Sequence, residues 1–114
     1  MTSEHKFQAT ETAGEVSAIL VRPKDARWLY VFGHGSGAGM RHVFMEECAE
    51  LLAVHGVATF RYQFPYMEAG LSIPNRAPVL IETVRSAVGA AGSIEPDLPL
   101  LAGGKSMGGR MTSA

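Results

Sequence analysis

The chain has 114 residues, of which 46% are hydrophobic and 18% are charged, and its formal net charge is −1. This length fits one small domain, and the composition is typical of a folded globular protein. The near-neutral charge gives no indication of a nucleic acid or an anionic membrane surface as a partner. Cys48 is the only cysteine, which excludes an intrachain disulfide and fits a reducing compartment.

The N-terminal segment and the apolar runs of the sequence bear on targeting. The N-terminus, MTSEHKFQAT, is polar and lacks the apolar core of a signal peptide. The longest apolar runs have the length of a strand, too short for a transmembrane helix. We therefore expect a soluble cytoplasmic protein, with one domain covering residues 1–114.

The first half of the chain predicts two strands and a helix. Residues 15–23 alternate in the manner of a strand. Residues 27–35 form a continuous apolar run, typical of a strand buried on both faces of a parallel sheet. A glycine-rich loop follows, and residues 41–56 then predict an amphipathic helix that stops at Gly56. Its predicted apolar face consists of Phe44, Cys48, Leu51, Leu52 and His55, with Cys48 in the core.

The second half continues the alternation of strands and helices. Residues 57–64 predict a strand. Residues 79–91 predict a helix, and Pro78 stands where its first helical residue is expected. Residues 98–103 predict a short strand, and a further helix begins after it. The irregular segment Phe64–Ala77 has two interpretations, a loop that shapes a substrate site or a plain connector.

This order of elements predicts an α/β fold with a mostly parallel sheet and flanking helices. In such sheets ligands bind beyond the carboxyl ends of the strands. Two glycine-rich loops, Gly33–Gly39 and Gly103–Gly109, follow predicted strands and therefore meet at that edge. We expect the functional site there.

The second loop contains the motif G-x-S-x-G, formed by Gly104, Ser106 and Gly108. A serine nucleophile in this motif sits on a sharp strand-to-helix turn, and side chains at the two glycine positions would clash. Ser106 is therefore a candidate nucleophile, with a small residue in a tight turn as the alternative. Acyl transfer also needs N–H donors for the developing oxyanion, and we assign the backbone N–H groups of Met107 and Ser36.

The first loop, around Ser36, leaves some roles open. Gly35 or Gly37 could supply the second oxyanion N–H in place of Ser36. His34 is interpreted as a residue that fixes the loop rather than as a base. His42 either borders the site or only caps the following helix.

Two phosphate-binding alternatives are weaker. The letters GGKS end like a P-loop, but Pro99 stands where that motif needs its first glycine. The letters GHGSGA match a dinucleotide-binding loop, but the next strand lacks the acidic residue that would bind a ribose. A nucleotide-binding α/β domain therefore remains a remote alternative.

Three stretches together, GHGSGAGM, FRYQFPYME and GGKSMGGR, resemble the bacterial α/β-hydrolase family related to dienelactone hydrolases. Eukaryotic relatives of that family are a testis-expressed protein and a subunit of a chromatin complex. The resemblance runs from about Gly14 to the end of the chain. It implies an α/β-hydrolase fold with strand order one-two-four-three-five, a serine nucleophile at Ser106 and an oxyanion loop at His34–Gly39.

The sequence departs from the family pattern in length. In this fold the nucleophile is followed by an acid and then a histidine, whereas all four histidines of this chain precede Ser106. We therefore expect the N-terminal half of an α/β-hydrolase fold, ending just after the nucleophile, inactive alone and derived from a protein of about 200 residues. The strand before Ser106 would be an exposed edge, and self-association through it is one predicted outcome.

The predicted function is that of a serine hydrolase acting on an ester, thioester or lactone. The expected partner is a small acyl substrate, with no nucleic acid, membrane, metal or cofactor. The alternative is a non-catalytic interaction module on a hydrolase scaffold. Lys105 keeps that alternative open, because the chemistry does not require a charge beside the nucleophile.

Overall fold

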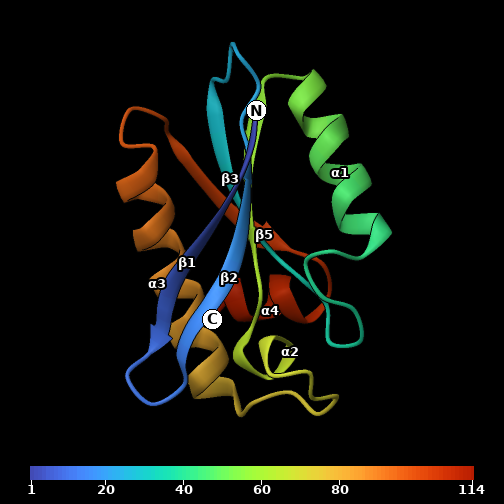
Figure 1. Cartoon of the computed structure of the whole chain (residues 1–114), viewed down its shortest axis with the longest axis vertical. Coiled ribbons are helices and arrows are strands. Elements are labelled where there is room, and N and C mark those ends of the chain that lie inside the picture. Colours follow the sequence, from blue (N-terminus) through green and yellow to red (C-terminus); the bar gives the residue numbers. More distant parts are fainter.

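A computed structural model describes all residues of the chain, 1–114. It contains one five-stranded sheet with helices on both faces (Figure 1). The elements in chain order are β1 (Thr2–Thr10), β2 (Gly14–Val21), β3 (Trp28–Gly33), α1 (Val43–Val54), β4 (Val57–Tyr62), α2 (Pro65–Glu68), α3 (Ala77–Ile94), β5 (Leu100–Gly104) and α4 (Met107–Ser113).

The strand order in the sheet is β1-β2-β4-β3-β5, which confirms the order implied by the family resemblance. β3 pairs in parallel with both β4 and β5, whereas β2 is antiparallel to β1 and to β4. The sheet is therefore mixed, and the parallel pairing predicted from the sequence is confined to β3, β4 and β5. The carboxyl ends of these three strands lie at one edge, as the site prediction requires.

Two elements were absent from the sequence-based prediction. β1 has a polar sequence in which only its last residues are buried, and it forms an antiparallel hairpin with β2. The turn between them ends at Gly14, whose φ of +81° suits glycine. α2 is a single turn that begins at Pro65, a favourable first helical residue. Both elements are too short or too polar for a clear periodic signal.

The helices lie on opposite faces of the sheet. α1 packs on β4 and β2, whereas α3 and α4 pack on the other face against β1, β3 and β5. Figure 1 shows α1 and α3 on either side of the strands. The main apolar core lies between the sheet and α3, where Leu80, Val84, Ala87 and Ala91 are buried as their spacing predicts.

The buried face of α1 differs from the predicted one. Met45 and Ala49 are its buried residues, whereas Phe44 and Leu51 are exposed and Cys48 is only partly buried. The predicted face was therefore wrong by about one residue. The apolar residues of this helix surround most of its circumference, so the sequence alone does not fix which side faces the sheet.

β5 lies at one edge of the sheet within residues 1–114, because it pairs only with β3. Its side chains Leu100 and Leu101 are 38% and 47% exposed. The exposure of these two leucines on an edge strand agrees with the prediction that the strand before Ser106 is an exposed apolar edge. No helix of the chain combines the length and the apolar composition that a membrane crossing needs.

Candidate active site

Ser106 stands between β5 and α4 in a strained backbone conformation. Its φ is 54° and its ψ is −111°, and it is the only non-glycine residue with a positive φ. A side-chain-bearing residue in such a sparsely populated region costs of order 1–3 kcal/mol, and such residues cluster at functional sites. The conformation is the one expected of a serine on a sharp strand-to-helix turn.

The glycines of the motif are required by close backbone contacts. A Cβ at Gly104 would lie 2.5 Å from the carbonyl oxygen of Gly33. A Cβ at Gly108 would lie 2.5 Å from the carbonyl carbon and oxygen of Gly33 and 2.7 Å from the carbonyl oxygen of His34. The end of β3 therefore presses directly against the turn. The sequence-based argument that side chains would clash at these two positions is confirmed.

The turn is also tied to β3 by a hydrogen bond. The Lys105 N–H donates to the Gly33 carbonyl over 3.0 Å. The Ser106 side chain is exposed and does not cap α4, and its hydroxyl makes no hydrogen bond within the chain. The serine is therefore fixed through its backbone while its oxygen stays accessible.

His34 anchors the loop that follows β3. Its side chain is fully buried, its Nδ1 lies 2.6 Å from the Gly35 carbonyl oxygen, and its Nε2 accepts the Phe64 N–H over 3.0 Å. This pattern assigns the proton to Nδ1, which donates to Gly35. Burial lowers the pKa of His34, with the hydrogen bond to Gly35 acting in the opposite direction. These contacts support its interpretation as a loop-fixing residue.

A second anchor comes from Tyr66, which sequence reasoning missed. Its hydroxyl donates a 2.8 Å hydrogen bond to the Ser36 carbonyl. The ring of Tyr66 also packs edge-on against His34, with centroids 6.0 Å apart. No residue of the segment Phe64–Ala77 lines the pocket at Ser106. Within residues 1–114 the segment therefore does not shape the pocket directly. It is also more than a plain connector, because Tyr66 supports the loop that contains Ser36.

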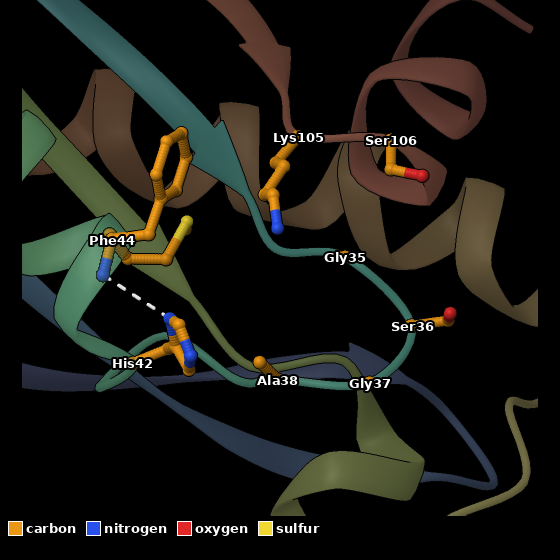
Figure 2. A pocket seen from close by; sticks show the side chains of 9 residues that line it. Gly35, Ser36, Gly37, Ala38, His42, Phe44, Lys105 and Ser106 are labelled. Atoms are coloured by element: carbon orange, nitrogen blue, oxygen red, sulfur yellow. Dashed lines mark hydrogen bonds between the residues drawn. The ribbon is translucent and has the colours of Figure 1, made fainter.

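The two glycine-rich loops enclose a pocket of about 280 Å³ (Figure 2). The first loop, α1 and the serine turn all contribute to its wall. Of the residues selected from the sequence, the pocket brings together Ser36, Gly35, Gly37 and Ser106, whereas His34, Gly104, Met107 and Gly108 are not among its lining residues. The lining residues are Gly35, Ser36, Gly37, Ala38, His42, Phe44, Met45, Lys105 and Ser106.

The N–H groups selected as oxyanion donors make no hydrogen bonds within the chain. Met107 is the first residue of α4, and Ser36 lies in an exposed turn. Neither backbone N–H has an acceptor among the hydrogen bonds of the protein. Gly35 also approaches the serine, since a Cβ on Gly35 would lie 3.9 Å from the Ser106 Cβ. Both loops thus bring backbone to the vicinity of the hydroxyl.

None of the four histidines is hydrogen-bonded to Ser106. His5 contacts Ser3 on β1, and His34 is occupied as described. His42 does both things considered for it, because it lines the pocket and its Nδ1 accepts the Phe44 N–H at the start of α1. His55 ends α1. No acidic residue lines the pocket, and no group of three metal-ligating side chains exists.

Comparison with known proteins agrees with this geometry. The family described as "Alpha/beta hydrolase domain" matches residues 26–114, which is most of the chain. The chain therefore belongs to the α/β-hydrolase family. No curated protein matches the sequence.

Solved structures are similar over nearly the whole chain. A dienelactone hydrolase from Anabaena variabilis has a TM-score of 0.73 and 21% identity, with 96% of this chain and 55% of that chain covered. A cold-adapted esterase from an Arctic intertidal metagenomic library has a TM-score of 0.75, 17% identity and coverages of 96% and 52%. Esterase Est22 has a TM-score of 0.79, 20% identity and coverages of 99% and 37%. The chain thus matches about half, or less, of each structure, and the likeness establishes the fold.

Proposed function

We propose that this chain is the N-terminal part of a serine hydrolase that cleaves an ester, thioester or lactone, with Ser106 as the nucleophile. The observation that carries the proposal is the backbone of Ser106, held at a φ of 54° between β5 and α4. Backbone strain at a single exposed serine on a strand-to-helix turn is typical of a nucleophile. The esterase and dienelactone hydrolase structures that share the fold support the same class of reaction.

The proposed reaction has two steps. The Ser106 oxygen attacks the carbonyl carbon of the substrate, the C=O π electrons move to the carbonyl oxygen, and a general base takes the hydroxyl proton. The resulting oxyanion accepts hydrogen bonds from the N–H groups of Met107 and Ser36. The leaving group departs with the proton, and water then releases the acyl group and restores the serine hydroxyl.

We assign the general base and the acid that orients it to the chain after Ala114. The nucleophile-acid-histidine order of this fold calls for them there. Two observations support the assignment, namely that no histidine bonds to Ser106 within residues 1–114 and that the structural relatives extend well beyond the matched region. Residues 1–114 then supply the nucleophile and the oxyanion donors.

Hydrolysis of 4-nitrophenyl butyrate by the protein expressed from its complete gene tests the proposal. Ser106→Ala is expected to lower kcat by at least about a thousandfold, because loss of the nucleophile leaves only the oxyanion donors and binding. Ser93→Ala is the matched control, since Ser93 is exposed in α3 and lies outside the pocket. Its activity is expected to equal that of the wild type.

Two other results would contradict the proposal. Equal hydrolysis by the wild type and Ser106→Ala would exclude Ser106 as the nucleophile. A folded protein with no hydrolysis of any ester, thioester or lactone would instead favour a non-catalytic interaction module on the hydrolase scaffold. Lys105 is the feature that keeps that alternative open, because acyl transfer does not require a charge beside the nucleophile.

A further inference from the structure

Lys105 brings an unpaired positive charge to the pocket beside Ser106. Its Nζ lies 5.0 Å from the centroid of the Phe44 ring, which is a cation–π contact. None of the three salt bridges of the chain includes Lys105, and its ammonium makes no hydrogen bond within the protein. Figure 2 shows its side chain extending from the serine turn into the space bordered by Phe44, His42 and Gly35.

The other groups around this pocket also favour an anion. His42 accepts the Phe44 N–H at Nδ1, so its Nε2 carries the proton and can donate a hydrogen bond. The twelve-residue helix α1 begins at this wall, and the N-terminus of a helix carries partial positive charge. No aspartate or glutamate lines the pocket. Within residues 1–114 the lining therefore has hydrogen-bond donors and a cation and includes no carboxylate.

The position of Phe44 helps to keep the charge in place. The ring is 41% exposed, and it belongs to the first turn of α1, whereas Lys105 belongs to the serine turn. Contact with the ring face holds the ammonium at the pocket while its hydrogen-bond donors remain free. Lys105 and Ser106 are neighbours in the same turn, and both line the pocket.

We propose that Lys105 is a specificity residue that binds a carboxylate carried by the acyl part of the substrate. The inference rests on the proposed function, because it assumes that an acyl group is bound at Ser106. The substrates it predicts are esters, thioesters or lactones whose acyl group ends in a carboxylate, such as half-esters of short dicarboxylic acids. In this proposal the reacting carbonyl is held at Ser106 and the carboxylate at the Lys105 ammonium, two residues that line the same pocket.

Two esters of matched size test this specificity with the protein expressed from its complete gene. One is 4-nitrophenyl hydrogen glutarate, and the other is 4-nitrophenyl pentanoate, in which a methyl group replaces the carboxylate. The ratio of their kcat/KM values is expected to favour the glutarate ester in the wild type. Lys105→Met is expected to lower that ratio about tenfold, since it removes one charge-assisted contact. Lys105→Arg is expected to retain the preference.

Lys24→Met is the matched control, because Lys24 is an exposed lysine in the β2–β3 turn and lies outside the pocket. It is expected to leave the kcat/KM of both esters unchanged. An unchanged substrate ratio in Lys105→Met would overturn the proposal, as would an equal loss of preference in Lys24→Met.

A binding measurement separates failure of this inference from failure of the proposed catalysis. Glutarate is titrated calorimetrically into the Ser106→Ala protein, which needs no turnover. We expect Lys105→Met in that background to weaken the Kd about tenfold. If the esters are not hydrolysed but glutarate binding depends on Lys105, only the catalytic proposal fails. If glutarate binding is absent or independent of Lys105, the anion site is refuted.

Discussion

Replacement of Gly108 by alanine is expected to destabilise the serine turn strongly. The new Cβ would lie 2.5 Å from the carbonyl carbon and oxygen of Gly33 and 2.7 Å from the oxygen of His34. Comfortable contacts are about 3.5–4.0 Å, so backbone must move by roughly 1 Å. The Gly33 carbonyl also accepts the Lys105 N–H, which resists that movement. Overpacking typically costs about 1–3 kcal/mol, and we expect about 3 kcal/mol here.

The assay is urea unfolding followed by far-UV circular dichroism, with the protein expressed from its complete gene. With an m-value of about 1–3 kcal/mol/M, Gly108→Ala should lower the midpoint by at least about 1 M. Gly89→Ala is the matched control, because Gly89 is exposed in α3 and has nothing within 4 Å of its Cβ position. It should stabilise by about 0.5–1 kcal/mol through helix propensity. A Gly108→Ala protein as stable as Gly89→Ala would refute the reasoning.

Three further outcomes are expected. Burial lowers the pKa of His34, so below about pH 6.5 the unfolded chain binds more protons than the folded one. The free energy of unfolding should therefore decrease as the pH is lowered below about 6.5, by at most about 1.4 kcal/mol per pH unit. His34→Gln should reduce this pH dependence in urea titrations at several pH values. Tyr66→Phe removes the hydrogen bond to Ser36, which should cost about 1 kcal/mol of stability and lower kcat more than it changes KM. Leu101→Lys places a charge on the exposed strand β5, and light scattering should show less self-association of the 114-residue chain than in the wild type.

The parts of the site that depend on local sequence were predictable. The G-x-S-x-G motif after an apolar run predicts a serine on a strand-to-helix turn, and Ser106 has that position. The clash at Gly104 and Gly108 was predictable for the same reason, because the motif specifies a close backbone approach. The alternation of apolar runs and helical periods likewise predicted β3, α1, β4 and α3 to within a few residues.

Features that depend on contacts between distant segments were not predictable. Tyr66 lies thirty residues from Ser36, and no local pattern reports that its hydroxyl reaches the loop. The contact between Lys105 and Phe44 likewise requires the end of β5 to lie beside the start of α1. β1 was missed because a strand with one solvent-exposed face needs few apolar residues, and here the pairing with β2 determines it.

The most direct test of the central claim is the site of reaction with a fluorophosphonate probe. The protein expressed from its complete gene is labelled and digested with trypsin, which cuts after Lys105 and Arg110 and releases residues 106–110. Ser106 is the only hydroxyl-bearing residue of this peptide. We expect mass spectrometry to find the phosphonyl adduct on this peptide, and heat-denatured protein to remain unlabelled. An adduct on another serine, or equal labelling after denaturation, would contradict the assignment of Ser106 as the nucleophile.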